Sequence, residues 1–168
     1  MTRFAIFTAA AAAALAVVIP AAAAAAYGPD TAACTAGSRR PAFLVNVSGF
    51  KARSGRVRVQ IYNSQNFLVK GERVTRIDLP VVAPTMPICV PLPGPGTYAV
   101  AVRHDVDGDN ARRDWSDGGG FSRNPHISLL HLKPSFSEVA VPIGNSPKAV
   151  SVVLLYRSGL SIGPAGRG

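Results

Sequence analysis

The chain has 168 residues, of which 48% are hydrophobic and 16% charged, and its formal charge at neutral pH is +9. This length accommodates one domain besides an N-terminal targeting segment, and such a domain buries enough surface to fold without a cofactor. No later segment is apolar over the length that a transmembrane helix needs, which argues against a helical membrane protein.

Residues 1–26 have the three parts of a secretory signal peptide. Arg3 supplies the positive start, residues 4–19 the apolar stretch, and residues 21–26 a run of small-residue cleavage sites. We therefore expect a periplasmic or secreted protein. Loss of Arg3 leaves the mature chain at +8, one unit below the full chain. Outside the cytosol this charge favours an anionic envelope component over nucleic acid, or serves only as a solvated surface.

The first strands follow a polar leader at residues 27–41, which we expect to be extended. Residues 43–47 and 57–61 alternate apolar and polar side chains, as half-buried strands do. A short glycine-containing turn at residues 51–55 joins them. The pattern predicts that the two strands form a hairpin.

The rest of the chain consists of short apolar runs between proline and glycine turns. The clearest strand is residues 97–104, where Tyr98, Val100 and Val102 share one face. Residues 150–156 form a long apolar run that we expect to be a central strand. The other expected elements are strands at residues 73–79, 86–90 and 138–143, helical turns at residues 63–71 and 127–132, and a flexible tail at residues 159–168.

Short strands with almost no helical periodicity predict an all-β fold. We expect an antiparallel β-sandwich, immunoglobulin-like or transthyretin-like, with one or two short helical turns. The sandwich domain is expected to span residues 42–158, between the leader and the tail.

The chain has two cysteines, Cys34 and Cys89. In an oxidising compartment they are expected to form a disulfide that ties the leader to the middle of the domain. The alternative is a lipoprotein in which Cys34 is lipidated. Thr31 stands three positions before Cys34, where lipoproteins usually have leucine, and this disfavours the alternative.

Five of the nine acidic residues lie in one loop after the 97–104 strand, and they are Asp105, Asp107, Asp109, Asp114 and Asp117. The first three have the one-three-five spacing of calcium ligands, and the last two could complete the shell. The match is incomplete because position twelve is Ser116 and not a bidentate glutamate. The alternative is an Asx-turn loop held by its own hydrogen bonds and by Arg–Asp pairs with Arg112 and Arg113.

Three further residues are candidates for binding. His104 could ligate a transition metal with His126 or His131, or it could hydrogen-bond to the loop and hold it in place. Trp115, the single tryptophan, could contact a ligand or partner, or form a lid on the sandwich edge. Phe121 lies in the glycine-rich return that follows.

Catalytic motifs find little support. The sequence has no Gly-x-Ser-x-Gly elbow, and residues 118–120 lack the lysine of a phosphate-binding loop. These glycines are expected to allow a sharp reversal of the chain. Lys51, Arg53, Arg56 and Arg58 form a basic set on the expected hairpin, with the last two on its water-facing side.

Residues 96–102, then His104-Asp105, then an Asp- and Gly-rich loop, then Gly120-Phe121-Ser122 with Asn124, resemble the bacterial domain-of-unknown-function family 2141. The resemblance covers residues of about 42–157. It implies an exported single-domain protein with a sandwich-like β fold, and it implies no activity. The segment 114–119 departs from the family's common pattern at this loop.

These observations lead to one functional hypothesis and one alternative. The hypothesis is a non-enzymatic module of the cell envelope that presents residues 104–124 to a ligand or another envelope protein, with calcium as the first cofactor to test. The alternative is a metal- or carboxylate-dependent hydrolase that acts on envelope material.

Overall fold

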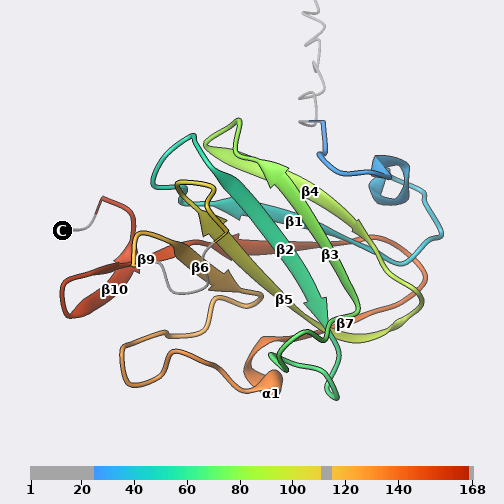
Figure 1. Cartoon of the computed structure of the whole chain (residues 1–168). Helices are drawn as coiled ribbons and strands as arrows, with labels where there is room; N and C mark the ends of the chain where they lie inside the picture. The colour runs from blue at the N-terminus through green and yellow to red at the C-terminus, as the bar shows by residue number, and fades with distance from the viewer. Residues whose placement is uncertain (1–24, 111–114, 167–168) are drawn as a thin grey trace, which may run out of the picture.

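A computed structural model describes residues 25–110 and 115–166, so the expected signal peptide lies almost wholly outside the described residues. Figure 1 shows two packed β-sheets with very little helix. The elements are η1 (Thr31–Cys34), β1 (Ala42–Ser48), β2 (Arg56–Tyr62), β3 (Thr75–Pro80), β4 (Thr85–Pro91), β5 (Gly96–Asp105), β6 (Gly118–Phe121), α1 (Phe136–Val139), β7 (Ala140–Ile143), β8 (Lys148–Val153), β9 (Leu155–Ser158) and β10 (Ser161–Pro164).

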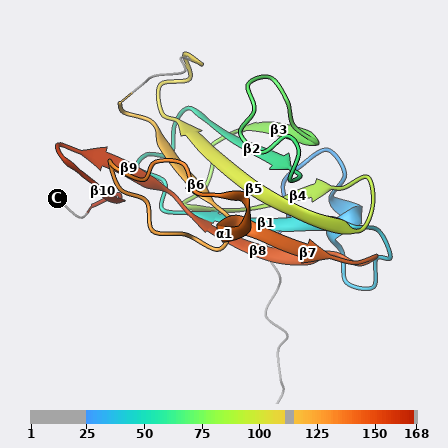
Figure 2. The same ribbon diagram turned by 90° about the horizontal axis from the view of Figure 1, so that it is seen from below.

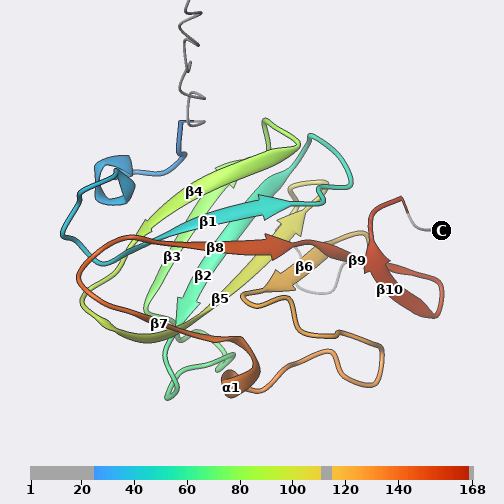
Figure 3. The same ribbon diagram turned by 180° about the vertical axis from the view of Figure 1, so that it is seen from behind.

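The two sheets differ in size. The smaller has the order β4-β1-β8 and lies nearest the viewer in Figure 3. The larger has the order β10-β9-β6-β5-β2-β3, and β7 pairs with the first part of β5. Figure 2 shows the two layers from below. All pairings between these strands are antiparallel except that of β1 with β8, which is parallel. The prediction of an all-β sandwich is confirmed.

The core between the sheets is built from the alternating residues that the sequence marked. Val57, Val59 and Ile61 of β2 are fully buried, and so are Val45 and Val47 of β1. Successive strand residues point to opposite faces, so Arg56, Arg58 and Gln60 lie on the outer face of the larger sheet. This outer face carries most of the candidate site residues.

The predicted hairpin of residues 43–61 is wrong. β1 pairs with β4 and β8, whereas β2 pairs with β3 and β5 in the other sheet. The 49–55 segment therefore crosses from one layer to the other. It approaches the end of β5 so closely that a Cβ on Gly55, whose φ is +70°, would lie 1.9 Å from the Asp105 carbonyl oxygen.

The predicted central strand of residues 150–156 is two strands. β8 ends at Val153 and β9 begins at Leu155, and the chain passes from the smaller to the larger sheet at the buried Leu154. β8 lies at an edge of its sheet and not at its centre. The predicted flexible tail also contains a strand, because residues 161–164 pair with β9 as β10.

The predicted helical turn at residues 127–132 is also wrong. That segment is a turn closed by reciprocal backbone hydrogen bonds between Ser128 and His131. No Ser-x-x-Glu pattern precedes residues 127–132 to cap the start of a helix there. The short helix instead follows at α1, where Ser135 and Glu138 form a capping box. Residues 63–71 form hydrogen-bonded turns.

A second, smaller apolar cluster covers part of the outer face of the larger sheet. It joins Tyr62 and Phe121 to Phe67 and Phe136, whose rings meet edge to face at 5.7–6.3 Å. The 63–68 turns and α1 are therefore packed onto this face.

The leader is attached to β4. The predicted disulfide between Cys34 and Cys89 is present, and Tyr27 exchanges backbone hydrogen bonds with the strand on either side of Ile88. Among the residues that the structure describes, no helix has the length and apolarity required to cross a membrane.

Candidate functional site

The acidic loop folds around the carboxylate of Asp105. This residue ends β5, is 3% exposed, and accepts backbone N–H bonds from Gly108 at 3.0 Å and Asn110 at 3.1 Å. Asn110 has a φ of +62°, a conformation that asparagine tolerates well. Asp107 accepts the amide of Asp109 at 3.2 Å. The Asx-turn interpretation therefore describes residues 105–110.

Three of the five predicted ligands come together. Asp105, Asp107 and Asp109 each offer one oxygen, and these oxygens lie within 4.8 Å of one another. Hard oxygen donors of this kind suit calcium. The two remaining ligands do not join this group among the described residues. Asp117 accepts hydrogen bonds from Arg103 Nε at 2.7 Å and the Val106 amide at 3.2 Å, and Asp114 lies outside the described residues.

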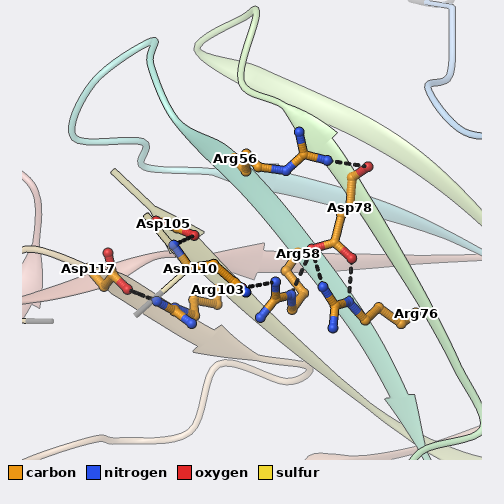
Figure 4. Close-up of polar contacts among 8 residues, drawn as sticks. All are labelled: Arg56, Arg58, Arg76, Asp78, Arg103, Asp105, Asn110 and Asp117. Atoms are coloured by element: carbon orange, nitrogen blue, oxygen red, sulfur yellow. Dashed lines mark hydrogen bonds and ion pairs between the residues drawn. The ribbon is translucent and has the colours of Figure 1, made fainter. Parts of the chain in front are cut away.

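Arginines of the sheet hold the loop against the outer face, as Figure 4 shows. Arg58 donates to Asp78 on β3 at 2.7 Å and to Asn110 in the loop at 2.6 Å. Arg76 also pairs with Asp78. Burial alone would raise the pKa of Asp78, but hydrogen bonds from Arg76 and Arg58 outweigh it and lower that pKa below the ordinary value. The arginines predicted to neutralise the loop, Arg112 and Arg113, lie outside the described residues.

His104 is fully buried and belongs to the core. Its Nδ1 lies 2.6 Å from the Tyr156 hydroxyl, and its Nε2 lies 2.9 Å from the Ser54 carbonyl oxygen. We expected His104 to hold the acidic loop, but the loop residue that it contacts is Ser54, in the 49–55 segment. His131, one of its suggested metal-binding partners, lies 3.5 Å from Glu138.

These contacts define the direction of one hydrogen-bond chain. The Ser54 carbonyl can only accept, so Nε2 of His104 carries a proton. Burial raises the pKa of Tyr156 to about 12, so its hydroxyl keeps its proton and donates to Nδ1. The same hydroxyl accepts the Lys51 amide at 3.0 Å. This series of hydrogen bonds joins the loop 49–55 to β5 and β9.

Trp115 lies at the mouth of an apolar groove. Its side chain is 69% exposed, and the Arg157 guanidinium carbon lies 3.4 Å from its ring centre, a stacked cation–π contact. The groove has a volume of about 260 Å³. Its apolar lining comes from β6, β9, β10 and the segments before and after β6, and consists of Trp115, Phe121, Ile127, Leu129, Leu132, Leu155 and Ile162.

Strand register explains the hollow. Gly119 pairs with Arg103 on one side and Leu155 on the other, so it stands between their side chains on the outer face. A Cβ on Gly119 would meet nothing closer than 3.6 Å. The missing side chain opens the floor of the groove between Phe121 and Leu155.

The prediction that the glycines at 118–120 allow a sharp chain reversal is wrong, and Gly118 and Gly120 are required for another reason. None of residues 118–120 has a positive φ, and all three lie in β6. A Cβ on Gly118 would lie 2.3 Å from the Tyr156 ring, and one on Gly120 would lie 2.6 Å from the Val153 carbonyl oxygen. These two positions are glycine because β6 packs directly on the strands beneath it.

The groove extends along β9 and β10. A second hollow of about 240 Å³ shares Phe121, Ile127, Leu155 and Ile162 with the first and continues to Pro164. Sequence reasoning identified Trp115 and Phe121 but missed the rest, because residues 127–132 were expected to be helical and Ile162 to lie in a flexible tail.

The basic set of the expected hairpin is divided. Arg56 and Arg58 lie on the outer face of β2 as predicted, while the Lys51 ammonium lies 6.0 Å from the ring centre of Tyr156. A separate hollow of about 440 Å³ brings Arg58 together with cations that the sequence did not single out. Its lining includes Arg58, Lys70, Arg73, Arg76 and Arg103.

No curated protein and no solved structure gives a significant match to the chain. A family model described as an uncharacterised protein conserved in bacteria matches residues 45–151, which is more than half of the chain and runs from β1 to β8. The match confirms the resemblance seen in residues 96–124. The chain therefore belongs to the bacterial domain-of-unknown-function family 2141.

Proposed function

We propose that the protein is an exported, non-enzymatic β-sandwich module that binds a ligand or an envelope partner in the apolar groove beside the 104–124 loop. The observation that carries this proposal is the exposed Trp115 above a groove of about 260 Å³ whose lining is mostly apolar. Binding sites for small molecules and peptides are typically concave, apolar and supplied with few polar groups. An aromatic side chain at the rim supplies contact area at low entropic cost.

The composition of the groove favours binding over catalysis. A hydrolase needs polar groups that converge on one point of a pocket. The carboxylate in this lining is Asp117, and it is already bonded to Arg103 and to the Val106 amide. The imidazole of His104 is buried on the opposite face of the sheet and bonded at both nitrogens.

Export is supported by the signal-peptide pattern of residues 1–26 and by the disulfide between Cys34 and Cys89, which belongs to an oxidising compartment. We infer a periplasmic or extracellular location, with an anionic envelope component or another envelope protein as partner. Fractionation of cells that express the full chain tests the location. Retention in the cytoplasm with both thiols reduced would contradict it.

Calcium remains a separate hypothesis for the trio Asp105, Asp107 and Asp109. Their oxygens are close enough to share an ion. Both oxygens of Asp105 already accept backbone amides, so the loop has a hydrogen-bonded structure of its own. Calorimetry with calcium decides. Binding tighter than millimolar that Asp107→Asn abolishes establishes the site, and binding weaker than millimolar ends the hypothesis.

The groove itself is tested with a neutral apolar fluorophore, N-phenyl-1-naphthylamine, and the single tryptophan as energy donor. We expect saturable 1:1 binding with quenching of Trp115 emission. Gly119→Leu should abolish binding, because its side chain would occupy the floor from a position where an added Cβ meets nothing closer than 3.6 Å. Val82→Ser removes an exposed apolar side chain elsewhere and should have no effect. Equal binding by the wild type and Gly119→Leu would overturn the proposal.

A further inference from the structure

We propose that the groove takes the single hydrocarbon chain of an anionic amphiphile and that Arg157 binds its headgroup. This inference rests on the proposed function and names the chemical class of the ligand. It depends on three observations, which are the shape of the apolar floor, the position of Arg157 and the exposed apolar side chains around the groove.

The apolar floor spans two adjoining hollows. The two hollows of about 260 and 240 Å³ share Phe121, Ile127, Leu155 and Ile162, so the apolar surface continues from Trp115 to Pro164. In the second hollow, the Asn124 side chain is hydrogen-bonded to β8 at Ser151 and Val153. A narrow surface that offers contact along its length but few polar partners suits an unbranched chain.

Arg157 stands where the headgroup of such a chain would lie. Its side chain lines the first hollow at the Trp115 end, and its Nε donates to the Gly159 carbonyl at 2.8 Å. Stacking on Trp115 holds the planar guanidinium, which presents its remaining N–H groups in a fork that matches a carboxylate or phosphate.

The charge around Arg157 is positive. In the ranges 25–110 and 115–166, no carboxylate lies within ion-pair distance of Arg157. Asp117, in the same lining, is paired with Arg103. Lys51 and Arg157 both line a further hollow. An anionic headgroup would therefore gain an uncompensated cation, whereas a cationic headgroup would be repelled.

Exposed apolar side chains gather around this groove. Leu130 is fully exposed and Leu160 is 87% exposed, at the tips of the 128–131 turn and the turn between β9 and β10. Leu132 and Trp115 line the groove between them. Leu160 follows Gly159, whose carbonyl oxygen accepts from Arg157, so this exposed apolar surface adjoins the groove at its Arg157 end.

The test uses the mature protein and amphiphiles that differ in one property at a time, below their micellar concentrations. Calorimetry and Trp115 fluorescence compare decanoate with dodecanoate, dodecanoate with 1-dodecanol, and dodecanoate with dodecyltrimethylammonium. We expect about fourfold tighter binding per added methylene. We also expect about tenfold tighter binding for the carboxylate than for the alcohol.

Two variants distinguish binding of the hydrocarbon chain from binding of the headgroup. Arg157→Gln should remove the preference for carboxylate over alcohol and keep the dependence on chain length. Gly119→Leu should abolish binding of both. Arg73→Gln, a cation elsewhere on the outer face, is the matched control and should change neither.

The outcomes are distinguishable. Equal affinity for carboxylate, alcohol and ammonium, unchanged by Arg157→Gln but abolished by Gly119→Leu, overturns this inference and leaves the proposed function standing. If neither the amphiphiles nor the neutral fluorophore bind, both this inference and the proposed function are overturned. Capture by anionic phospholipid vesicles without binding of monomeric dodecanoate also overturns the inference, since the surface would then recognise a bilayer.

Discussion

The hydroxyl of Tyr156 lies 2.6 Å from Nδ1 of His104, and this buried contact joins β9 to β5 across the interval occupied by β6. β6 leaves room for it because Gly118 has no side chain to meet the Tyr156 ring. The position of the hairpin β9–β10 against His104 therefore depends on the glycine at position 118.

Tyr156→Phe should lower the free energy of unfolding by roughly 1–3 kcal/mol, because Nδ1 of His104 is left buried without a partner. The pKa of Tyr156 is raised in the folded state to about 12, so its contribution is complete below the unfolded value near pH 10 and is lost as pH rises toward 12. Chemical denaturation between pH 8 and 12 should show a steeper loss for the wild type than for the variant. Tyr98→Phe is the control, since that hydroxyl donates to the Gly94 backbone carbonyl oxygen and not to a buried histidine.

Gly120→Ala should destabilise the fold and Gly119→Ala should not. The added Cβ at position 120 would lie 2.6 Å from a backbone oxygen that cannot rotate away, whereas at position 119 it meets only ordinary contacts. Overpacking of this kind costs about 1–3 kcal/mol. Thermal unfolding of the two variants measures the difference, and equal melting temperatures would contradict the assigned register of β6.

Replacement of both cysteines by serine should lower stability by about 4 kcal/mol at most, because the disulfide closes a loop of 55 residues in the unfolded chain. The loss should be matched by reduction of the wild type. Denaturant titration with and without reductant provides the measurement. If reduction leaves the midpoint unchanged, the attachment of the leader does not contribute to folding.

Asp78 should make the protein sensitive to acid. Its pKa is lowered in the folded state, so the stability that it contributes is complete above the unfolded value near pH 4 and is lost as pH falls through the lower folded pKa. Asp78→Asn should therefore be less stable than the wild type at pH 7 and approach it below pH 3. Asp30→Asn is the comparison: the Arg40 hydrogen bond lowers the pKa of Asp30 too, but that pair is exposed, so the difference should have the same sign and be smaller. A constant difference from pH 7 to pH 2 would contradict the assignment.

The sequence identified local structure where side chains alternate and failed where distant partners decide. The alternation of Val57, Val59 and Ile61 is enough to predict a half-buried strand, and these side chains are buried in β2. Residues 43–61 carry no signal for the true partners of β1, which are β4 some forty residues later and β8 near the C-terminus. The local pattern therefore favours a hairpin with the next strand along the chain, and that prediction is wrong. The apolar run 150–156 gave no sign of its break at Leu154.

The candidate site shows the same division. The crowding of aspartates after β5 is visible in the sequence, and the trio of Asp105, Asp107 and Asp109 does come together. The groove is not visible, because Phe121, Leu155 and Ile162 are brought onto one face only by the pairing of β6, β9 and β10. The absent side chain of Gly119 is a feature of register that composition cannot show.

The passage of the chain from β8 to β9 at Leu154 has a consequence for how the protein denatures. β8 and β9 form one extended segment that belongs to both sheets. Unfolding of either sheet therefore displaces a strand of the other. Calorimetry should therefore give one heat-absorption peak with equal calorimetric and van't Hoff enthalpies. Amide protons of Val152 and Tyr156, on either side of the crossing, should exchange with solvent at similar rates through that same global opening.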